Sequence, residues 1–145
     1  MKQQFDTTKF STTPFQQRVN KPWGHEIIYT LAEAPVTGKI LHVKAGKRLS
    51  LQYHDEKVET LCLISGEGKL VLSDSSGKQK EIKMQKEKGY FIRPGQIHRI
   101  IAVSDIIVIE PSTAEIGNTF RLEDDYSRQT ETEEMRKEKD RGWQK

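Results

Sequence analysis

Three side chains with metal-binding atoms lie close together in residues 46–66, which read GKRLSLQYHDEKVETLCLISG. Gln52 and His54 are two residues apart, so on a β-strand both side chains emerge on the same face. A short polar turn follows, and Glu59 then opens a second apolar run. A metal ion bound by these three residues needs a further donor from elsewhere in the chain. His98, in the stretch GYFIRPGQIHR, is the candidate for that ligand.

The types of these donors indicate which ions they suit. Imidazole nitrogen and carboxylate or amide oxygen bind zinc, manganese, iron and related ions. A glutamine ligand is neutral and donates weakly, so Gln52 favours a Lewis-acid ion over a redox centre. A single histidine is more often a hydrogen-bonded structural residue. Here, however, four candidate ligands fall on predicted strands, at positions whose side chains can face a common site. We expect one divalent metal ion, zinc first, with manganese, cobalt, nickel or iron as alternatives.

The elements that must position these ligands are short β-strands. Runs rich in β-branched and aromatic residues recur at short intervals, with turn residues at 65–68, 74–77 and 94–95 between them. No helical periodicity is convincing before residue 130. The predicted strands span residues 25–31, 38–44, 48–54, 59–65, 68–73, 79–84, 90–93, 97–103 and 106–110. Many short strands separated by turns predict an all-β sandwich or barrel, and a jelly roll fits best.

The two faces of the predicted strands suggest an assembly. In the strand 59–65, Glu59, Leu61 and Leu63 share one face, and the mostly apolar residues between them share the other. Strands that are apolar on both sides indicate a barrel interior on one face and a partner subunit on the other. We therefore expect a homodimer.

Length and charge restrict the class of protein. A chain of 145 residues is long enough for one domain with a core and short for two. The net charge of +3 does not by itself indicate nucleic-acid or membrane binding. The N-terminus has no apolar run that resembles a signal peptide, and no segment approaches transmembrane length. The expected location is the cytoplasm, and the expected partner is a small molecule.

Polar segments flank the predicted barrel. Residues 1–18 are rich in Gln, Thr and Ser with isolated phenylalanines, which indicates either a poorly ordered arm or an arm that docks on a partner subunit. Residues 19–128 form the predicted barrel. Residues 129–145 are polar on all sides apart from Met135 and Trp143, which favours a frayed terminal helix or a disordered tail.

The ligand-bearing stretches resemble the two cupin motifs. The first motif reads Gly, five residues, His-x-His, three or four residues, Glu, six residues, Gly. This chain has Gln at the first histidine position and matches the rest, with Gly46, Gln52, His54, Glu59 and Gly66. Residues 95–98 resemble the end of the second motif, whose histidine, here His98, is the last metal ligand. The resemblance implies a double-stranded β-helix, the cupin jelly-roll barrel.

Within the cupins, the chain most resembles type II mannose-6-phosphate isomerases in their stand-alone form. The resemblance covers residues 19–128 and rests on KPWGHE (21–26), LSLQYH (49–54), Glu59, SGEG (65–68), IHR (97–99) and RLEDDYSR (121–128). It implies a metal-dependent isomerase that interconverts mannose 6-phosphate and fructose 6-phosphate through an enediol. The nucleotidyltransferase part of the larger bifunctional enzymes is absent, so pyrophosphorylase activity is not implied.

The resemblance also implies roles for charged residues. The metal would hold two sugar oxygens, a base would move a proton between C1 and C2, and basic side chains would hold the phosphate. We expect Lys57, Glu26 and Arg121 to take part in catalysis. We expect Lys21, Arg99 and Arg128 to bind the substrate. For the proton carrier, Glu26, His42 and a metal-bound water all remain open.

Two other functions are compatible with the sequence. The larger enzymes read H-x-x-R-x-E-H-W where this chain reads HDEKVETL, so Lys57 replaces an arginine and Thr60-Leu61 replaces His-Trp. These differences favour the alternative of a non-catalytic module that binds a sugar or a nucleotide sugar. A metal-dependent dioxygenase is a further alternative, against which Gln52 argues because three histidines suit redox iron better.

Overall fold

The computed structural model describes residues 4–142. Among these residues the chain forms eleven β-strands and three short 3-10 helices. The strands are β1 (Gln17–Lys21), β2 (Gly24–Ile28), β3 (Val36–Val43), β4 (Leu51–His54), β5 (Glu59–Ser65), β6 (Gly68–Ser73), β7 (Gln79–Lys83), β8 (Gly89–Ile92), β9 (His98–Ala102), β10 (Ile106–Thr113) and β11 (Thr119–Glu123). The 3-10 helices are η1 (Thr7–Lys9), η2 (Met135–Lys137) and η3 (Lys139–Gly142). None of the helices in this part of the chain has the length and apolar composition needed to cross a membrane.

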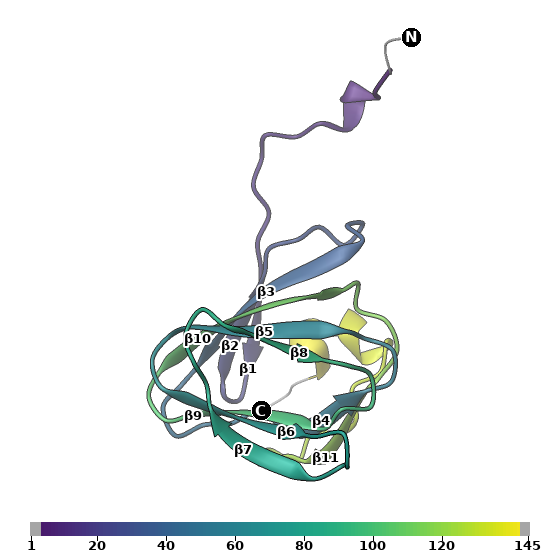
Figure 1. Cartoon of the computed structure of the whole chain (residues 1–145). Coiled ribbons are helices and arrows are strands. Elements are labelled where there is room, and N and C mark those ends of the chain that lie inside the picture. The colour runs from purple at the N-terminus through teal and green to yellow at the C-terminus, as the bar shows by residue number, and fades with distance from the viewer. Residues whose placement is uncertain (1–3, 143–145) are drawn as a thin grey trace.

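The strands form two antiparallel sheets that enclose a common interior (Figure 1). The larger sheet has the order β1-β2-β3-β10-β5-β8, and the smaller has the order β11-β4-β9-β6-β7. Strands far apart in the sequence are neighbours, since β3 and β5 both pair with β10, and β4 and β6 both pair with β9. This arrangement is a jelly-roll barrel, which confirms the predicted fold class.

Most of the strands were predicted, but two were missed. All nine predicted strands are present, and β5 and β6 have the predicted bounds. The sequence missed β1, which starts at Gln17, inside the segment predicted as an arm, and buries Val19. It also missed β11, where TFRLE contains too few apolar residues to stand out from a loop.

The predicted alternation of β5 is confirmed. Glu59, Leu61 and Leu63 are at most 3% exposed and face the interior, whereas Ile64 is 40% exposed on the other side. The interior cluster also includes Trp23 and residues from β3, β6, β8, β9 and β10. Each large apolar side chain that is fully buried stabilises the fold by about 1.5–3 kcal/mol. The apolar cluster therefore fixes the positions of the strands that carry the charged interior residues.

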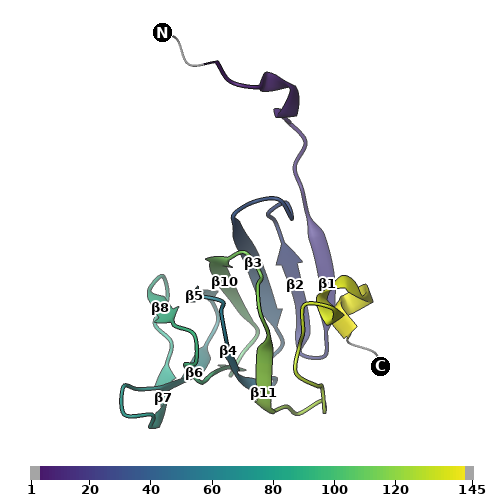
Figure 2. The same cartoon turned by 90° about the vertical axis from the view of Figure 1, so that its right-hand side faces the viewer.

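The two ends of the chain differ in their relation to the barrel. Residues 4–16 are exposed, including Phe5, Phe10 and Phe15, and Figure 1 shows this arm extending away from the barrel. Residues 129–142 instead fold back beside β1 and β11, as Figure 2 shows. The interpretation of this tail as frayed or disordered is thus corrected for the described part, because ion pairs with the barrel hold it; Trp143 lies outside the described residues.

A pair of glycine substitutions tests the barrel's close packing between β5 and β10. Gly66 and Gly77 both have positive φ, at 84° and 82°. A Cβ on Gly66 would lie 2.1 Å from the backbone oxygen of Asp105, whereas a Cβ on Gly77 would meet nothing within 4 Å. We expect Gly77→Ala to lose about 1–2 kcal/mol of unfolding free energy from backbone conformation alone. Gly66→Ala should lose roughly 1–3 kcal/mol more from the clash, measured by urea denaturation. Equal losses would contradict this account.

Candidate functional site

Three of the four predicted metal ligands meet in the barrel interior. His54 on β4 and His98 on β9 come from the smaller sheet, and Glu59 on β5 comes from the larger one. Their ligand atoms all lie within 4.8 Å of one another. Glu59 Oε1 is 2.9 Å from His98 Nε2 and 3.3 Å from His54 Nε2. This buried group is a candidate metal centre.

Outer contacts turn both imidazoles towards Glu59. His98 Nδ1 lies 2.9 Å from the backbone oxygen of Gln96, which can only accept, so Nδ1 donates to this oxygen and Nε2 is the atom directed towards Glu59. His54 Nδ1 lies 2.9 Å from Thr119 Oγ1. Burial lowers the pKa of His54, although Glu59 opposes this shift, so the ring stays neutral as metal binding requires.

Gln52 lies beside the same centre. It is the register partner of His98 between β4 and β9, and its Nε2 is 3.4 Å from His98 Nε2. Its Oε1 accepts a hydrogen bond from Ser50 Oγ at 2.5 Å. Rotating the amide by half a turn would direct Oε1 towards His98, and Nε2 could then donate to the Ser50 hydroxyl. Gln52 therefore lies where its amide oxygen could bind the same metal ion as His54, Glu59 and His98.

The chemistry of the donor set fits a divalent cation. Two imidazoles, one carboxylate and one amide oxygen match the ligands that zinc and related ions take. Burial would raise the pKa of Glu59, but Lys57 and the two histidines hold it well below its usual range, so the carboxylate is ionised. Glu59 Oε2 is buried without a hydrogen bond, 3.1 Å from Lys57 Nζ.

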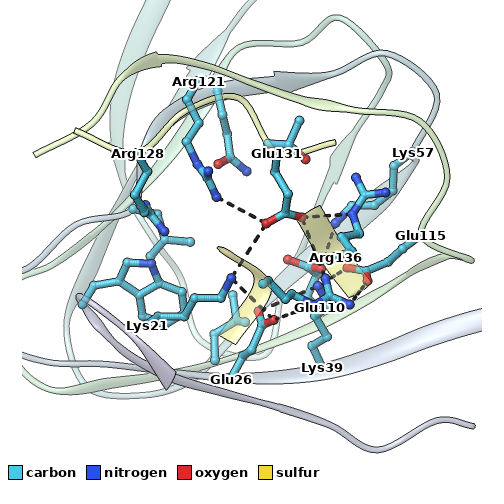
Figure 3. A pocket seen from close by; sticks show the side chains of 16 residues that line it. Lys21, Glu26, Lys39, Lys57, Glu110, Glu115, Arg121, Arg128, Glu131 and Arg136 are labelled. Carbon is cyan, nitrogen blue, oxygen red and sulfur yellow. Dashed lines mark hydrogen bonds and ion pairs between the residues drawn. The ribbon is translucent and has the colours of Figure 1, made fainter. Parts of the chain in front are cut away.

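A small charged cavity adjoins this centre. Its volume is about 60 Å³, and Gln52 and Glu110 line both this cavity and the small space beside the metal ligands. Figure 3 shows its charged side chains converging from several elements. Its basic side chains are Lys21, Lys39, Lys57, Arg121, Arg128, Arg136 and Arg141, and its acidic ones are Glu26, Glu110, Glu115 and Glu131.

Lys57 links the candidate metal centre to the charged cavity. Its Nζ is 3.1 Å from Glu59 and 3.2 Å from Glu110, and all three residues are buried. Burial alone would lower the pKa of Lys57, but Glu110 and Glu59 raise it above its ordinary value, so the ammonium stays charged. Burial and the nearby charge of Glu59 raise the pKa of Glu110 to about 7, against the opposing effect of Lys57. Glu110 can therefore exchange a proton near neutral pH.

Most of the predicted substrate and catalytic residues line this cavity. Lys21, Glu26, Lys57, Arg121 and Arg128 do so. Arg128 is less available than the others, since its guanidinium forms two hydrogen bonds with Asp124 at 2.8 and 2.9 Å.

Two predicted candidates lie elsewhere. Arg99 is buried near the metal ligands, but it donates to the backbone oxygen of Leu49 and to Glu123, so it ties β9 to neighbouring segments. His42 stacks on His25 at 4.3 Å and is not among the residues lining the charged cavity. The structure thus favours Glu26 over His42 among the predicted proton carriers.

Several cavity residues were not predicted from the sequence. Lys39 lies on the same inward face of β3 as the buried Leu41. Glu110 lies on the same inward face of β10 as the buried Val108. A charged residue on the apolar face of a strand was the signal that could have found them. Glu115 follows β10 in a loop, and Glu131, Arg136 and Arg141 belong to the tail. Their sequence context carried no such signal.

The fold and the interior His/Glu/His group define a cupin. Comparison with protein families matches residues 9–131 to the family described as mannose-6-phosphate isomerase C-terminal. The chain belongs to this family. No curated protein matches it.

Solved structures show the same fold at low identity. Oxalate decarboxylase from Bacillus subtilis, in a structure determined at pH 4.6, has a TM-score of 0.65 and 18% identity, over 79% of this chain and 33% of its own. The capsular polysaccharide assembling protein CapF from Staphylococcus aureus has a TM-score of 0.62 and 18% identity, over 81% of this chain and 36% of its own. The chain thus spans about a third of the length of these proteins.

Removing one candidate ligand tests the metal centre. We expect the wild type to bind one divalent ion per chain. His98→Ala should weaken metal binding by at least roughly 10–100-fold, because loss of a residue that only hydrogen-bonds to a metal ligand already weakens binding by that factor. His25→Ala, on the outer side of β2, should leave the affinity unchanged. Calorimetry with Zn²⁺ and Mn²⁺ measures both. Equal affinity in the two variants would place the ion elsewhere.

Acid should weaken the docking of the tail through Glu131. Burial would raise the pKa of this carboxyl, but Lys21, Lys39, Arg141 and Arg121 lower it to about 2. A depressed carboxyl pKa stabilises the fold above the ordinary value of 4.5, and this contribution is lost as pH falls towards 2. Between pH 5 and pH 2.5 the wild type should lose about 2 kcal/mol more than Glu131→Gln.

The measurement is chemical denaturation at pH 5 and pH 2.5. Glu134→Gln is the matched control, since Glu134 lies in the same tail and its side chain is 82% exposed. A Glu131→Gln variant that is as acid-sensitive as the control would contradict the ion-pair account.

Proposed function

We propose that this protein is a metal-dependent sugar-phosphate isomerase that interconverts mannose 6-phosphate and fructose 6-phosphate. One observation carries the proposal: a candidate divalent metal centre adjoins a cavity rich in basic side chains in a member of this family. Isomerisation of an aldose phosphate needs charge stabilisation at the reacting carbons and cations at the distant phosphate. A candidate metal centre and a cluster of basic side chains on adjoining walls of one interior support the proposal on both points.

The proposed cofactor is one divalent ion, zinc in the first instance, with manganese, cobalt, nickel or iron as alternatives. His54, Glu59, His98 and Gln52 would hold it. When bound, such an ion supplies a Lewis acid that stabilises negative charge on the sugar oxygens.

Glu110 is the best-suited proton carrier in this proposal. With a pKa of about 7 it can both accept a proton from a sugar carbon and return it. Glu26 suits this role less well, because Lys39, Lys21 and Arg141 lower its pKa against the effect of burial and keep it ionised. Lys57 then acts as a positioning residue, whose ion pairs hold Glu110 and Glu59 at a fixed separation.

Lys21 and Arg121 are the proposed phosphate-binding residues. Both side chains are about 6–7% exposed and reach the cavity from barrel strands β1 and β11. Arg128 would assist from the cavity edge, where Asp124 already neutralises it.

A binding module without catalysis is the second candidate function. The cavity of about 60 Å³ is much smaller than the roughly 300–1,000 Å³ of ordinary ligand pockets. Its basic side chains are also paired with the chain's own carboxylates. This candidate predicts saturable binding of a sugar phosphate or nucleotide sugar without conversion, which calorimetry and NMR of the sugar distinguish from turnover.

We also propose a homodimer that covers the outer face of the larger sheet. Partly exposed apolar side chains from neighbouring strands occupy this face, namely Ile40, Ile109, Cys62 and Phe91. Sedimentation equilibrium should give twice the mass of the chain, 16.7 kDa. A monomer at micromolar concentration would refute this assembly.

Substitution of the two candidate proton carriers tests the isomerase proposal. With a divalent ion added, the wild type should convert mannose 6-phosphate, and a chelator should stop it. Glu110→Gln should lower kcat by about 10²–10⁴-fold, the usual contribution of a general acid–base. Its metal content should be unchanged, since Glu110 is not a ligand.

Glu26→Gln is the comparison variant, because it changes a buried carboxylate of the same cavity. We expect it to retain most of kcat. A larger loss in Glu26→Gln than in Glu110→Gln would reassign the proton carrier, and no turnover with any divalent ion would refute the isomerase.

A further inference from the structure

The carboxylate of Glu131 lies among the basic side chains of the charged cavity (Figure 3). Its oxygens are 3.0 Å from Arg136 Nε, 3.3 Å from Arg121 Nη2 and 3.9 Å from Lys21 Nζ. Its side chain is 9% exposed. Glu131 thus offers an anionic group to Lys21 and Arg121, as a ligand's phosphate would.

The backbone fixes this carboxylate in place. Glu131 and Thr119 form an isolated antiparallel bridge with two backbone hydrogen bonds of 2.9 Å. Thr119 is the first residue of β11, the strand that also carries Arg121. The tail residues 129–142, here called the strap, therefore insert Glu131 from the edge of the barrel.

Polar contacts hold the strap, and large apolar side chains contribute little. Glu133 accepts from the Gly117 amide at 2.8 Å, Asp140 accepts from the Asn20 amide at 3.3 Å, and Arg141 pairs with Glu115. Its largest described apolar side chain, Met135, is only partly buried, and η2 buries no residue. Detaching the strap would therefore leave the apolar core of the barrel covered.

The docked strap leaves hydrogen-bond donors unsatisfied. Arg121 Nε on the barrel is buried without a hydrogen-bond acceptor, and so are Arg136 Nη1 and Arg141 Nε on the strap. Buried polar groups are normally paired, and Arg121 belongs to the barrel, so its unpaired Nε indicates a site that a better acceptor can occupy once the strap is displaced. A phosphate has more acceptor oxygens and more charge than one carboxylate.

The size of the cavity also indicates that the strap must move before a hexose phosphate can bind. A volume of about 60 Å³ holds a few water molecules but no hexose phosphate. The strap supplies Glu131, Arg136 and Arg141 to the cavity lining. Its displacement would open the cavity on the side of Lys21 and Arg121.

We propose that Lys21 and Arg121 form a subsite for a phosphate monoester, and that Glu131 of the strap occupies this subsite as an internal competitor in the ligand-free protein. Phosphate binding and strap docking exclude each other in this scheme, so each weakens the other by the same factor. The inference rests on the proposed function for the choice of a phosphorylated ligand. It concerns binding alone and does not depend on turnover.

The test measures binding of inorganic phosphate and mannose 6-phosphate to the full chain by calorimetry, with mannose as the uncharged probe. Glu131→Gln should bind both phosphates at least about 5-fold more tightly than the wild type, the lower end of usual coupling between sites. Glu134→Gln, in the same strap with an 82% exposed side chain, should bind like the wild type. Arg121→Gln added to Glu131→Gln should remove the gain. Unchanged or weaker phosphate binding in Glu131→Gln would overturn the proposal.

A second readout covers the case in which Glu131→Gln fails to fold, which circular dichroism would reveal. In the wild type, phosphate should speed hydrogen exchange at the amides of Thr119 and Glu131, because the bridge between them opens with the strap. Arg141→Gln should loosen the strap, whose ion pair with Glu115 it removes, and raise phosphate affinity while keeping Lys21 and Arg121. Phosphate that binds without faster exchange at these amides would also overturn the proposal.

The outcomes separate this inference from the proposed function. Strap displacement by phosphate in a protein that never isomerises the sugar would refute the isomerase and keep the subsite. Isomerase activity in a protein whose Glu131→Gln variant binds phosphate as the wild type does would refute the competitor and keep the isomerase.

Discussion

The pairing of buried charges is the constraint on which the rest of this structure depends. An ionised side chain inside a barrel is costly unless an opposite charge and hydrogen bonds compensate it. Lys57 shows how the chain meets this constraint, since one ammonium compensates Glu59 at the metal centre and Glu110 at the cavity. The candidate metal centre and the cavity are therefore parts of one electrostatic network, and a change in one alters the charge balance of the other.

The sequence predicted the part of the site that local spacing determines. Gln52 and His54 could be found because strand periodicity places them on one face, and the context that they share with Glu59 resembles a known motif. Glu131 could not be found in this way. It contacts Lys21, which lies 110 positions earlier in the chain, and its own neighbourhood reads as a solvated polar tail. Charge partners joined only by tertiary structure leave no local pattern.

Membership of the family establishes the fold. The reaction has to be inferred from the residues of the candidate site. The solved neighbours are less than 20% identical, and the match covers only about a third of their length, so they support the barrel and not a substrate. The features that favour a sugar phosphate belong to this chain: a His/Glu/His group with Gln52 beside it, and Lys21 and Arg121 on two strands of the cavity wall.

In the proposed isomerase, the candidate metal centre faces the reacting carbons while the cavity cations hold the phosphate. Paramagnetic relaxation of mannose 6-phosphate bound to the Mn²⁺-loaded protein tests this most directly, because relaxation falls steeply with distance from the ion. We expect strong relaxation of the C1 and C2 nuclei and weaker relaxation of phosphorus. Strongest relaxation at phosphorus, or none above that of uncharged mannose, would contradict it.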